Sequence, residues 1–118
     1  MDSKTTIDNL KNKVKKFCED RDWDNFHNPK DLAIGIITES SELLEHFRFK
    51  SNEESESIIR TNKDGISEEL SDIFYFVLRL AQKYDIDLSE ELDKKLKKNT
   101  EKYPIEKSKG SNKKYGEL

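Results

Sequence analysis

Apolar residues recur at intervals of three and four along most of the chain, which is the spacing of one face of an α-helix. This pattern predicts four helices and no strand. The first three cover about residues 6–20, 28–49 and 66–81, and the fourth begins at Asp87 or Ser89 and stops before Pro104. Thr5, Thr6 or Asp8 can cap the first helix, and Asn28 before Pro29 marks the start of the second. We therefore expect an all-α fold.

Two polar segments interrupt or follow these helices. Residues 50–65 are rich in Ser, Asn, Glu and Lys, so we expect a polar loop, either a solvated connector or a mobile lid, with at most a helical turn at Ile58 and Ile59. Residues 105–118 are rich in Lys, Ser and Gly, and their composition alone predicts a disordered tail.

The composition limits how the chain can be stabilised and what it can bind. Of the 118 residues, 32% are hydrophobic and 40% are charged, so a monomer buries only a modest core and self-association is expected. A formal charge of -3 gives no general attraction to a nucleic acid polymer. The single Cys18 is expected to be a reduced core thiol. Because no apolar run is long enough for a signal peptide or a membrane span, we expect a cytoplasmic protein that does not engage a membrane.

Four carboxylates form two similar pairs on the second and third predicted helices. Glu39 and Glu42 are three residues apart, as are Glu69 and Asp72, so each pair projects from one side of its helix. In both helices the pair borders the apolar stripe, so packing the two stripes together would gather four acidic groups at the edge of the core. Such a cluster is unfavourable without a cation, and oxygen ligands suit Mg²⁺, with Mn²⁺ as a substitute. The alternative is that these are ordinary margins of two amphipathic helices.

Other common catalytic patterns are absent. A ferritin-like di-iron centre needs Glu-x-x-His pairs, and the chain has none. It also lacks a Gly-rich phosphate loop, a nucleophile elbow and a Cys/His zinc pattern. What remains is metal-assisted attack by water. His46 lies four residues after Glu42, where it either reaches a phosphate or metal-bound water or serves only as a hydrogen-bonding residue at the edge of the stripe.

The two acidic pairs and several further segments resemble one family. Glu39-Ser-Ser-Glu42, 26 intervening residues and then Glu69-Leu-Ser-Asp72 resemble the MazG-like all-α nucleoside triphosphate pyrophosphohydrolases. Further segments are similar, in the same order, to the dCTP pyrophosphatase branch of that family: residues 21–29, Lys95, Asn99, residues 103–104, 108–111 and 114–115. The resemblance extends from Ile7 to Tyr115.

For the site, the resemblance implies Mg²⁺ at the four carboxylates and cleavage between the α and β phosphates, giving a nucleoside monophosphate and pyrophosphate. The substrate contacts that it implies are Trp23, His27, Phe49, Phe76, Lys95, Asn99, Lys109 and Tyr115. Trp23 would line or stack on the base, Lys95 and Asn99 would contact the phosphates or sugar, and Lys109 would help to hold the triphosphate. Phe49 replaces a second base-contacting Trp and Phe76 replaces a Tyr, which leaves the base preference open.

For the assembly, the resemblance implies a homodimer or homotetramer of four-helix bundle-like units, with the tetramer favoured. The chain would be one domain over residues 1–118, with the tail 105–118 packed on a neighbouring subunit. Its function would be to clean the nucleotide pool by hydrolysing dCTP or a modified dCTP. Two alternatives remain at this point: a pyrophosphohydrolase for another nucleotide, and a non-enzymatic helical interaction module.

Overall fold

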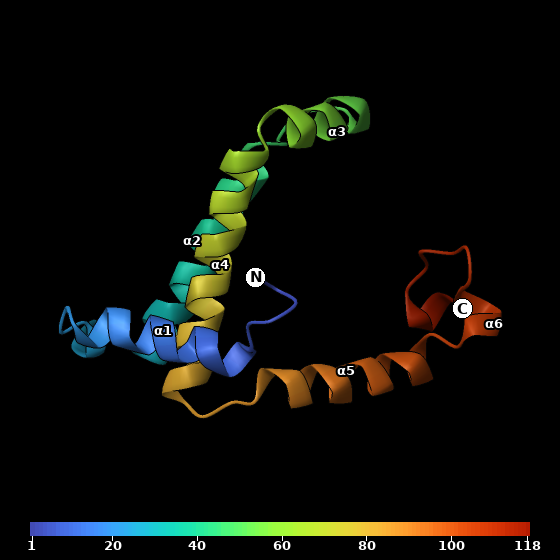
Figure 1. Cartoon of the computed structure of the whole chain (residues 1–118). Coiled ribbons are helices and arrows are strands. Elements are labelled where there is room, and N and C mark those ends of the chain that lie inside the picture. Colours follow the sequence, from blue (N-terminus) through green and yellow to red (C-terminus); the bar gives the residue numbers. More distant parts are fainter. The chain divides into compact units, whose positions relative to one another are not determined.

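The structure is a computed structural model that describes residues 1–118, and every regular element in it is helical (Figure 1). The all-α prediction is therefore confirmed. The α-helices are α1 (Ile7–Glu19), α2 (Pro29–Glu45), α3 (Asn52–Thr61), α4 (Lys63–Lys83), α5 (Leu88–Lys102) and α6 (Ile105–Ser108). Two short 3₁₀ helices are η1 (Asp24–Phe26) and η2 (Tyr115–Glu117). None of the helices combines the length and the apolar character that a membrane span requires.

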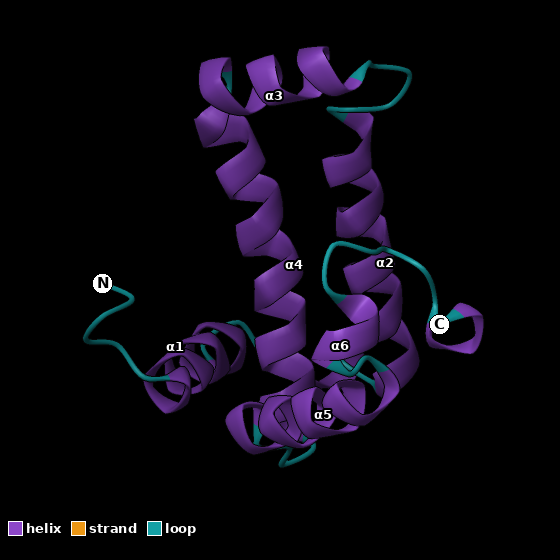
Figure 2. Ribbon diagram, turned by 90° about the vertical axis from the view of Figure 1, so that its right-hand side faces the viewer, coloured by secondary structure: helices purple, strands orange, loops and turns teal.

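The chain divides into two compact units, Met1–Asp85 and Ile86–Leu118. In the first unit, α2 and α4 lie side by side, α3 lies across one end of this pair, and α1 packs against α4 (Figures 1 and 2). The buried apolar core of this unit is small and consists of Cys18, Leu32, Ile66, Leu78 and Ala81. Cys18 is buried with a free thiol, as the sequence predicts.

The predicted caps set the starts of the first two helices. The side chain of Thr6 accepts a hydrogen bond from the Asn9 amide and begins α1, and Asn28 accepts one from the Asp31 amide and begins α2. Pro29 occupies the first turn of α2, where its missing N–H leaves no hydrogen bond unmade. These caps fix where the chain enters the two helices.

The loop prediction for residues 50–65 is wrong, because α3 occupies Asn52–Thr61. Ser51 accepts a hydrogen bond from the Glu54 amide, and the Glu54 carboxylate accepts one from the Ser51 amide. This reciprocal capping box satisfies two backbone donors of the first turn and stabilises a helix in a polar sequence. The box also lowers the pKa of Glu54, because its charged form accepts these hydrogen bonds.

The second helix also ends earlier than predicted, at Glu45 instead of near Phe49. Residues 46–49 form a turn, and Phe49 has a φ of 64°, in the left-handed region. The left-handed residue thus lies at the end of this turn, and the Phe49 side chain is 91% exposed beneath the guanidinium of Arg48, which lies 4.6 Å from the ring centroid.

The predicted apolar stripes of α2 and α4 are buried only in part. Leu32 and Ile66 are buried, but Ile37 is 70% exposed and Leu70 is 53% exposed. Each stripe is wider than the contact between two helices, so its remaining part faces outward. This leaves large apolar side chains on the surface of the first unit.

The second unit begins with α5, which is capped by Asp87, the first of the two predicted start residues. The tail is not disordered, which corrects the interpretation from composition. It contains α6 and η2, and the ring of Tyr115 packs edge-on against Tyr103 with centroids 6.2 Å apart. The ammonium group of Lys102 lies 4.8 Å from the Tyr115 ring centroid. These contacts with the end of α5 order a segment that is polar in composition.

Candidate metal centre and adjoining cavity

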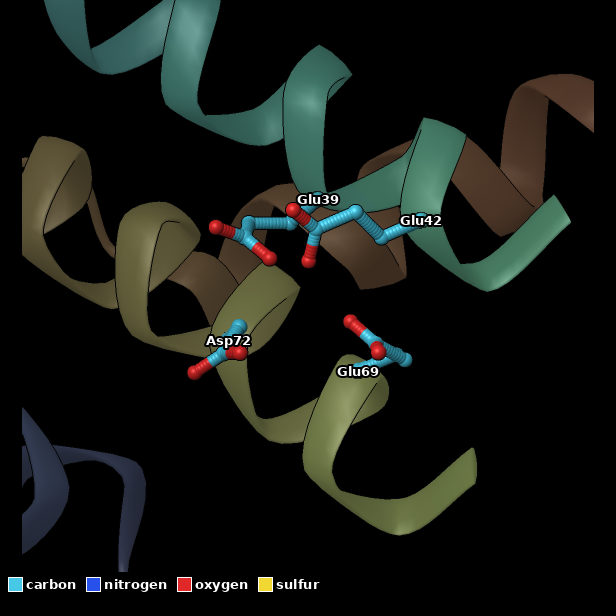
Figure 3. A group of neighbouring side chains, drawn as sticks. All are labelled: Glu39, Glu42, Glu69 and Asp72. Atoms are coloured by element: carbon cyan, nitrogen blue, oxygen red, sulfur yellow. The ribbon is translucent and has the colours of Figure 1, made fainter. Parts of the chain in front are cut away.

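The four acidic residues that sequence spacing singled out lie together between α2 and α4 (Figure 3). Glu39 and Glu42 project from α2, and Glu69 and Asp72 project from α4. One carboxylate oxygen from each residue lies within 4.8 Å of the corresponding oxygens of the others. Glu39 and Glu69 are half-buried, and the other two are exposed. The cluster therefore has a shielded inner side and an open outer side.

The electrostatics of this cluster favour a bound cation. One oxygen of Glu39 and one of Glu69, Oε2 in each case, are buried without a hydrogen-bond partner. Burial, a hydrogen bond with Glu42 and the neighbouring carboxylate charges raise the pKa of Glu39 to about 7. Orphaned acceptor atoms and mutual repulsion are both relieved by a hard cation, so the donor set fits Mg²⁺ or Mn²⁺.

His46 supports the cluster from beside α2. Its Nε2 lies 3.4 Å from Oε1 of Glu69, and both side chains are half-buried. This contact confirms the expected hydrogen bond of an edge histidine. It orients the Glu69 carboxylate and leaves the other oxygen, Oε2, for a ligand.

A cavity of about 450 Å³ adjoins the cluster. Its lining residues come from α1, the turn after α1, and α4: Lys13, Val14, Phe17, Trp23, Asp72 and Tyr75. Asp72 thus belongs both to the carboxylate cluster and to the cavity wall. The aromatic walls meet edge to face, because the Phe17 ring centroid lies 5.6 Å from that of Trp23 and 6.0 Å from that of Tyr75. A flat aromatic ligand next to the acidic cluster would fit this arrangement.

Sequence reasoning found Trp23 but missed most of the other cavity residues. Val14 and Phe17 lie on the apolar stripe of α1, a position typical of core residues, yet Phe17 is 41% exposed. Tyr75 gave no signal because its hydroxyl is bound to a residue distant in sequence, the Cys18 thiol, at 3.2 Å. Lys13 is one of many lysines, and only the fold distinguishes it.

The structure places the other predicted substrate contacts in several different locations. The His27 ring lies beside Trp23, with centroids 6.1 Å apart. Phe76 packs against Gly35 of α2, where an added Cβ would lie 2.5 Å from the ring, and neither Phe76 nor Phe49 lines the cavity. The remaining four, Lys95, Asn99, Lys109 and Tyr115, belong to the second unit. Their roles stay predictions.

Comparison with known proteins gives consistent matches over nearly the whole chain. The family model described as "MazG-like family" matches residues 34–118, a range that includes all four carboxylates. The dCTP pyrophosphatase 1 of Mus musculus is 32% identical over 115 residues, which is 96% of this chain and 68% of that protein. The human dCTP pyrophosphatase 1 is 30% identical over the same shares of both proteins. A crystal structure of a pyrophosphatase from Archaeoglobus fulgidus matches with a TM-score of 0.80 and 32% identity, covering 83% of this chain and 92% of that one.

Proposed function

The chain belongs to the MazG-like family, and on this basis we propose that it is a Mg²⁺-dependent hydrolase of dCTP or a modified dCTP that releases the nucleoside monophosphate and pyrophosphate. Its assignment as a nucleoside triphosphate pyrophosphohydrolase follows from its relatives, several of which are dCTP pyrophosphatases. By this proposal the protein clears unwanted deoxynucleotides from the cytoplasmic pool.

One observation carries the proposal. Four carboxylates that fit a hard cation adjoin an aromatic cavity, and Asp72 is part of both. A triphosphate joins a planar base to a polyanion, so its two ends match the two halves of this site. A chain with a formal charge of -3 otherwise offers little to attract three phosphates.

Glu39, Glu42, Glu69 and Asp72 would hold the metal in this mechanism. When bound, Mg²⁺ would supply a water of lowered pKa and neutralise phosphate charge. The protein's own residues bind and orient the substrate. Trp23 and the other aromatic walls take up the base and exclude water from one side of it, and His46 keeps the Glu69 carboxylate fixed. Holding the reacting groups in place in this way lowers the entropic part of the barrier.

Self-association is part of the proposal. Ile37 and Leu44 of α2 and Leu70 and Phe74 of α4 are between 40% and 70% exposed, and a second copy would bury them. We propose a homo-oligomer, with a tetramer favoured and with residues 105–118 packed on a neighbouring subunit. Light scattering of the wild type and of Ile37→Asp tests this, since a charge at this position should reduce the mass of the assembly.

Product analysis tests the activity. The purified protein is incubated with dCTP and Mg²⁺, and chromatography separates monophosphate plus pyrophosphate from diphosphate plus phosphate. We expect the first pair of products, lost with EDTA and with Glu69→Gln but retained by Glu68→Gln, an exposed glutamate one residue away. If triphosphates of another base are cleaved faster than dCTP and its modified forms, the base assignment is wrong. If a folded protein cleaves no nucleotide of a full panel, the chain is an interaction module instead.

A further inference from the structure

The one buried charged side chain of the protein lies against η1 and His27, which follow Trp23 in the chain. Arg79 of α4 is 1% exposed. It follows Asp72 by seven residues, or two helical turns, and therefore lies on the same side of α4 as that carboxylate. A buried guanidinium is costly unless its donors are paired. All three of its nitrogens donate: Nε to Nδ1 of His27 at 2.9 Å, Nη1 to Oε1 of Gln82 at 2.6 Å, and Nη2 to Oδ1 of Asp24.

The bond from Arg79 determines which nitrogen of His27 carries the ring proton. An arginine Nε is always protonated and can only donate, so Nδ1 of His27 must be the acceptor. The proton of the neutral ring then resides on Nε2. Moving the proton to Nδ1 would break this bond, and adding a second proton there would also place two cations in contact.

The surroundings keep His27 in this neutral form. The charged groups around it are Asp24 of η1 and Arg79 and Lys83 of α4. Burial and the two cations lower the pKa of His27, and only Asp24 opposes them. The ring therefore presents a permanent Nε2–H donor at neutral pH.

The same contacts hold the wall of the cavity. The ammonium group of Lys83 donates to the main-chain carbonyls of Asp24 and His27. Side chains of α4 therefore bind both the side chains and the backbone of the turn that contains η1. Trp23 directly precedes this turn, packs against the His27 ring and lines the cavity. The helix that carries Asp72 thus also fixes the position of the aromatic wall.

We propose that Arg79 is a positioning residue for nucleotide binding, which locks His27 as the Nε2–H tautomer and holds Trp23 in place against the base. The inference rests on the proposed function, because it assigns the cavity to the nucleotide. It differs from a purely structural role for Arg79 in predicting a defined tautomer and an effect on binding of the substrate.

Nuclear magnetic resonance of the histidine rings is the first test and needs no nucleotide. The chain has only His27 and His46, so ¹⁵N-labelled protein without a purification tag gives two ring systems. We expect His27 to show Nε2–H with a titration midpoint below 6.5, its ordinary pKa. In Arg79→Met we expect a mixture of tautomers and a higher midpoint. An Nδ1–H tautomer in the wild type, or a spectrum unchanged in the variant, would overturn the proposal even if the enzyme is active.

Kinetics is the second test. Because one lost hydrogen bond to a charged group is worth about a tenfold effect, we expect KM of Arg79→Met to rise roughly tenfold, with kcat changed by less than about threefold. Arg60→Met, which removes an exposed arginine from α3, is the matched control and should behave as the wild type.

If Arg79→Met does not fold, Arg79→Lys is the second variant. Lysine keeps the buried charge but lacks the planar guanidinium whose Nε donates to His27, so the same rise in KM is expected. An unchanged KM, or a fall in kcat without a change in KM, would contradict the positioning role. If no nucleotide is hydrolysed at all, the proposed function fails, and the tautomer measurement still decides whether Arg79 sets the state of His27.

Discussion

Replacing Glu39 by Gln should change the stability of the protein in opposite directions with and without metal. The four ligand oxygens lie within 4.8 Å of one another. At that distance two unit charges repel by about 0.9 kcal/mol in water and by about 3.5 kcal/mol at an effective dielectric constant of 20. Glu42 and Asp72 are exposed, so the lower value is the better guide.

Glu39→Gln removes three such repulsions at pH 8, where the Glu39 carboxyl is charged. Part of this repulsion persists in the unfolded chain, so we expect a gain of about 2 kcal/mol in EDTA, or about 8 °C in Tm for a domain of this size. In Mg²⁺ the order reverses. The wild type gains about 2.7 kcal/mol when the metal is at 100 times its Kd, and the variant, with one ligand fewer, gains much less.

Thermal and urea unfolding at pH 8, each in EDTA and in Mg²⁺, measure both effects. Glu68→Gln is the matched control, because it makes the same chemical change at an exposed position beside the cluster and should shift stability by less than about 0.5 kcal/mol. If Glu39→Gln is less stable than the wild type in EDTA, or if the control shifts equally, the four carboxylates do not form a strained metal-free cluster.

Three further predictions follow from packing, capping and titration. Gly35→Ala should destabilise the protein by about 1 kcal/mol in urea unfolding, because overpacking against the Phe76 ring outweighs the better helix propensity of Ala; a stabilised variant would show that the ring moves freely. Ser51→Ala should remove about 1 kcal/mol and speed amide exchange in α3, since the capping box with Glu54 is lost; unchanged exchange would mean that packing alone holds this helix. The pKa of Glu39 is raised from 4.5 to about 7, so the metal-free folded state binds more protons than the unfolded state in that range. Its stability should therefore fall as pH rises from about 4.5 to about 7 in EDTA, and Glu39→Gln should flatten this dependence, whereas a rise with pH would contradict the assigned shift.

The carboxylate cluster was predictable because it depends on local geometry. Spacing of three residues places two side chains on one side of a helix, and the position of each pair beside an apolar stripe predicts that the pairs meet when the stripes pack. The helix α3 is also encoded locally, by the capping box of Ser51 and Glu54, although the polar composition of residues 50–65 on its own predicts a loop.

The Arg79 network could not be found in this way, because it is made by tertiary contacts. Arg79 bonds to His27 across 52 residues and to Asp24 across 55, and nothing in the local sequence distinguishes it from a solvated arginine. Likewise, the periodic pattern predicts that Ile37 lies on the apolar face of its helix, but it does not predict whether other residues of the chain bury that position. Periodicity reports which side of a helix is apolar, and burial depends on what packs there.

The most direct test of the account is whether metal binding and hydrolysis are lost together when the cluster is changed. Titration with Mn²⁺, followed by electron paramagnetic resonance, measures the bound metal, and the same samples are assayed for release of pyrophosphate. We expect the wild type and Glu68→Gln to bind Mn²⁺, to release it on addition of excess Mg²⁺, and to hydrolyse the nucleotide. We expect Glu69→Gln to bind the metal at least tenfold more weakly and to lose activity in parallel. If Glu69→Gln binds Mn²⁺ as the wild type does, or if it hydrolyses the nucleotide without bound metal, the four-carboxylate centre is not the site of catalysis.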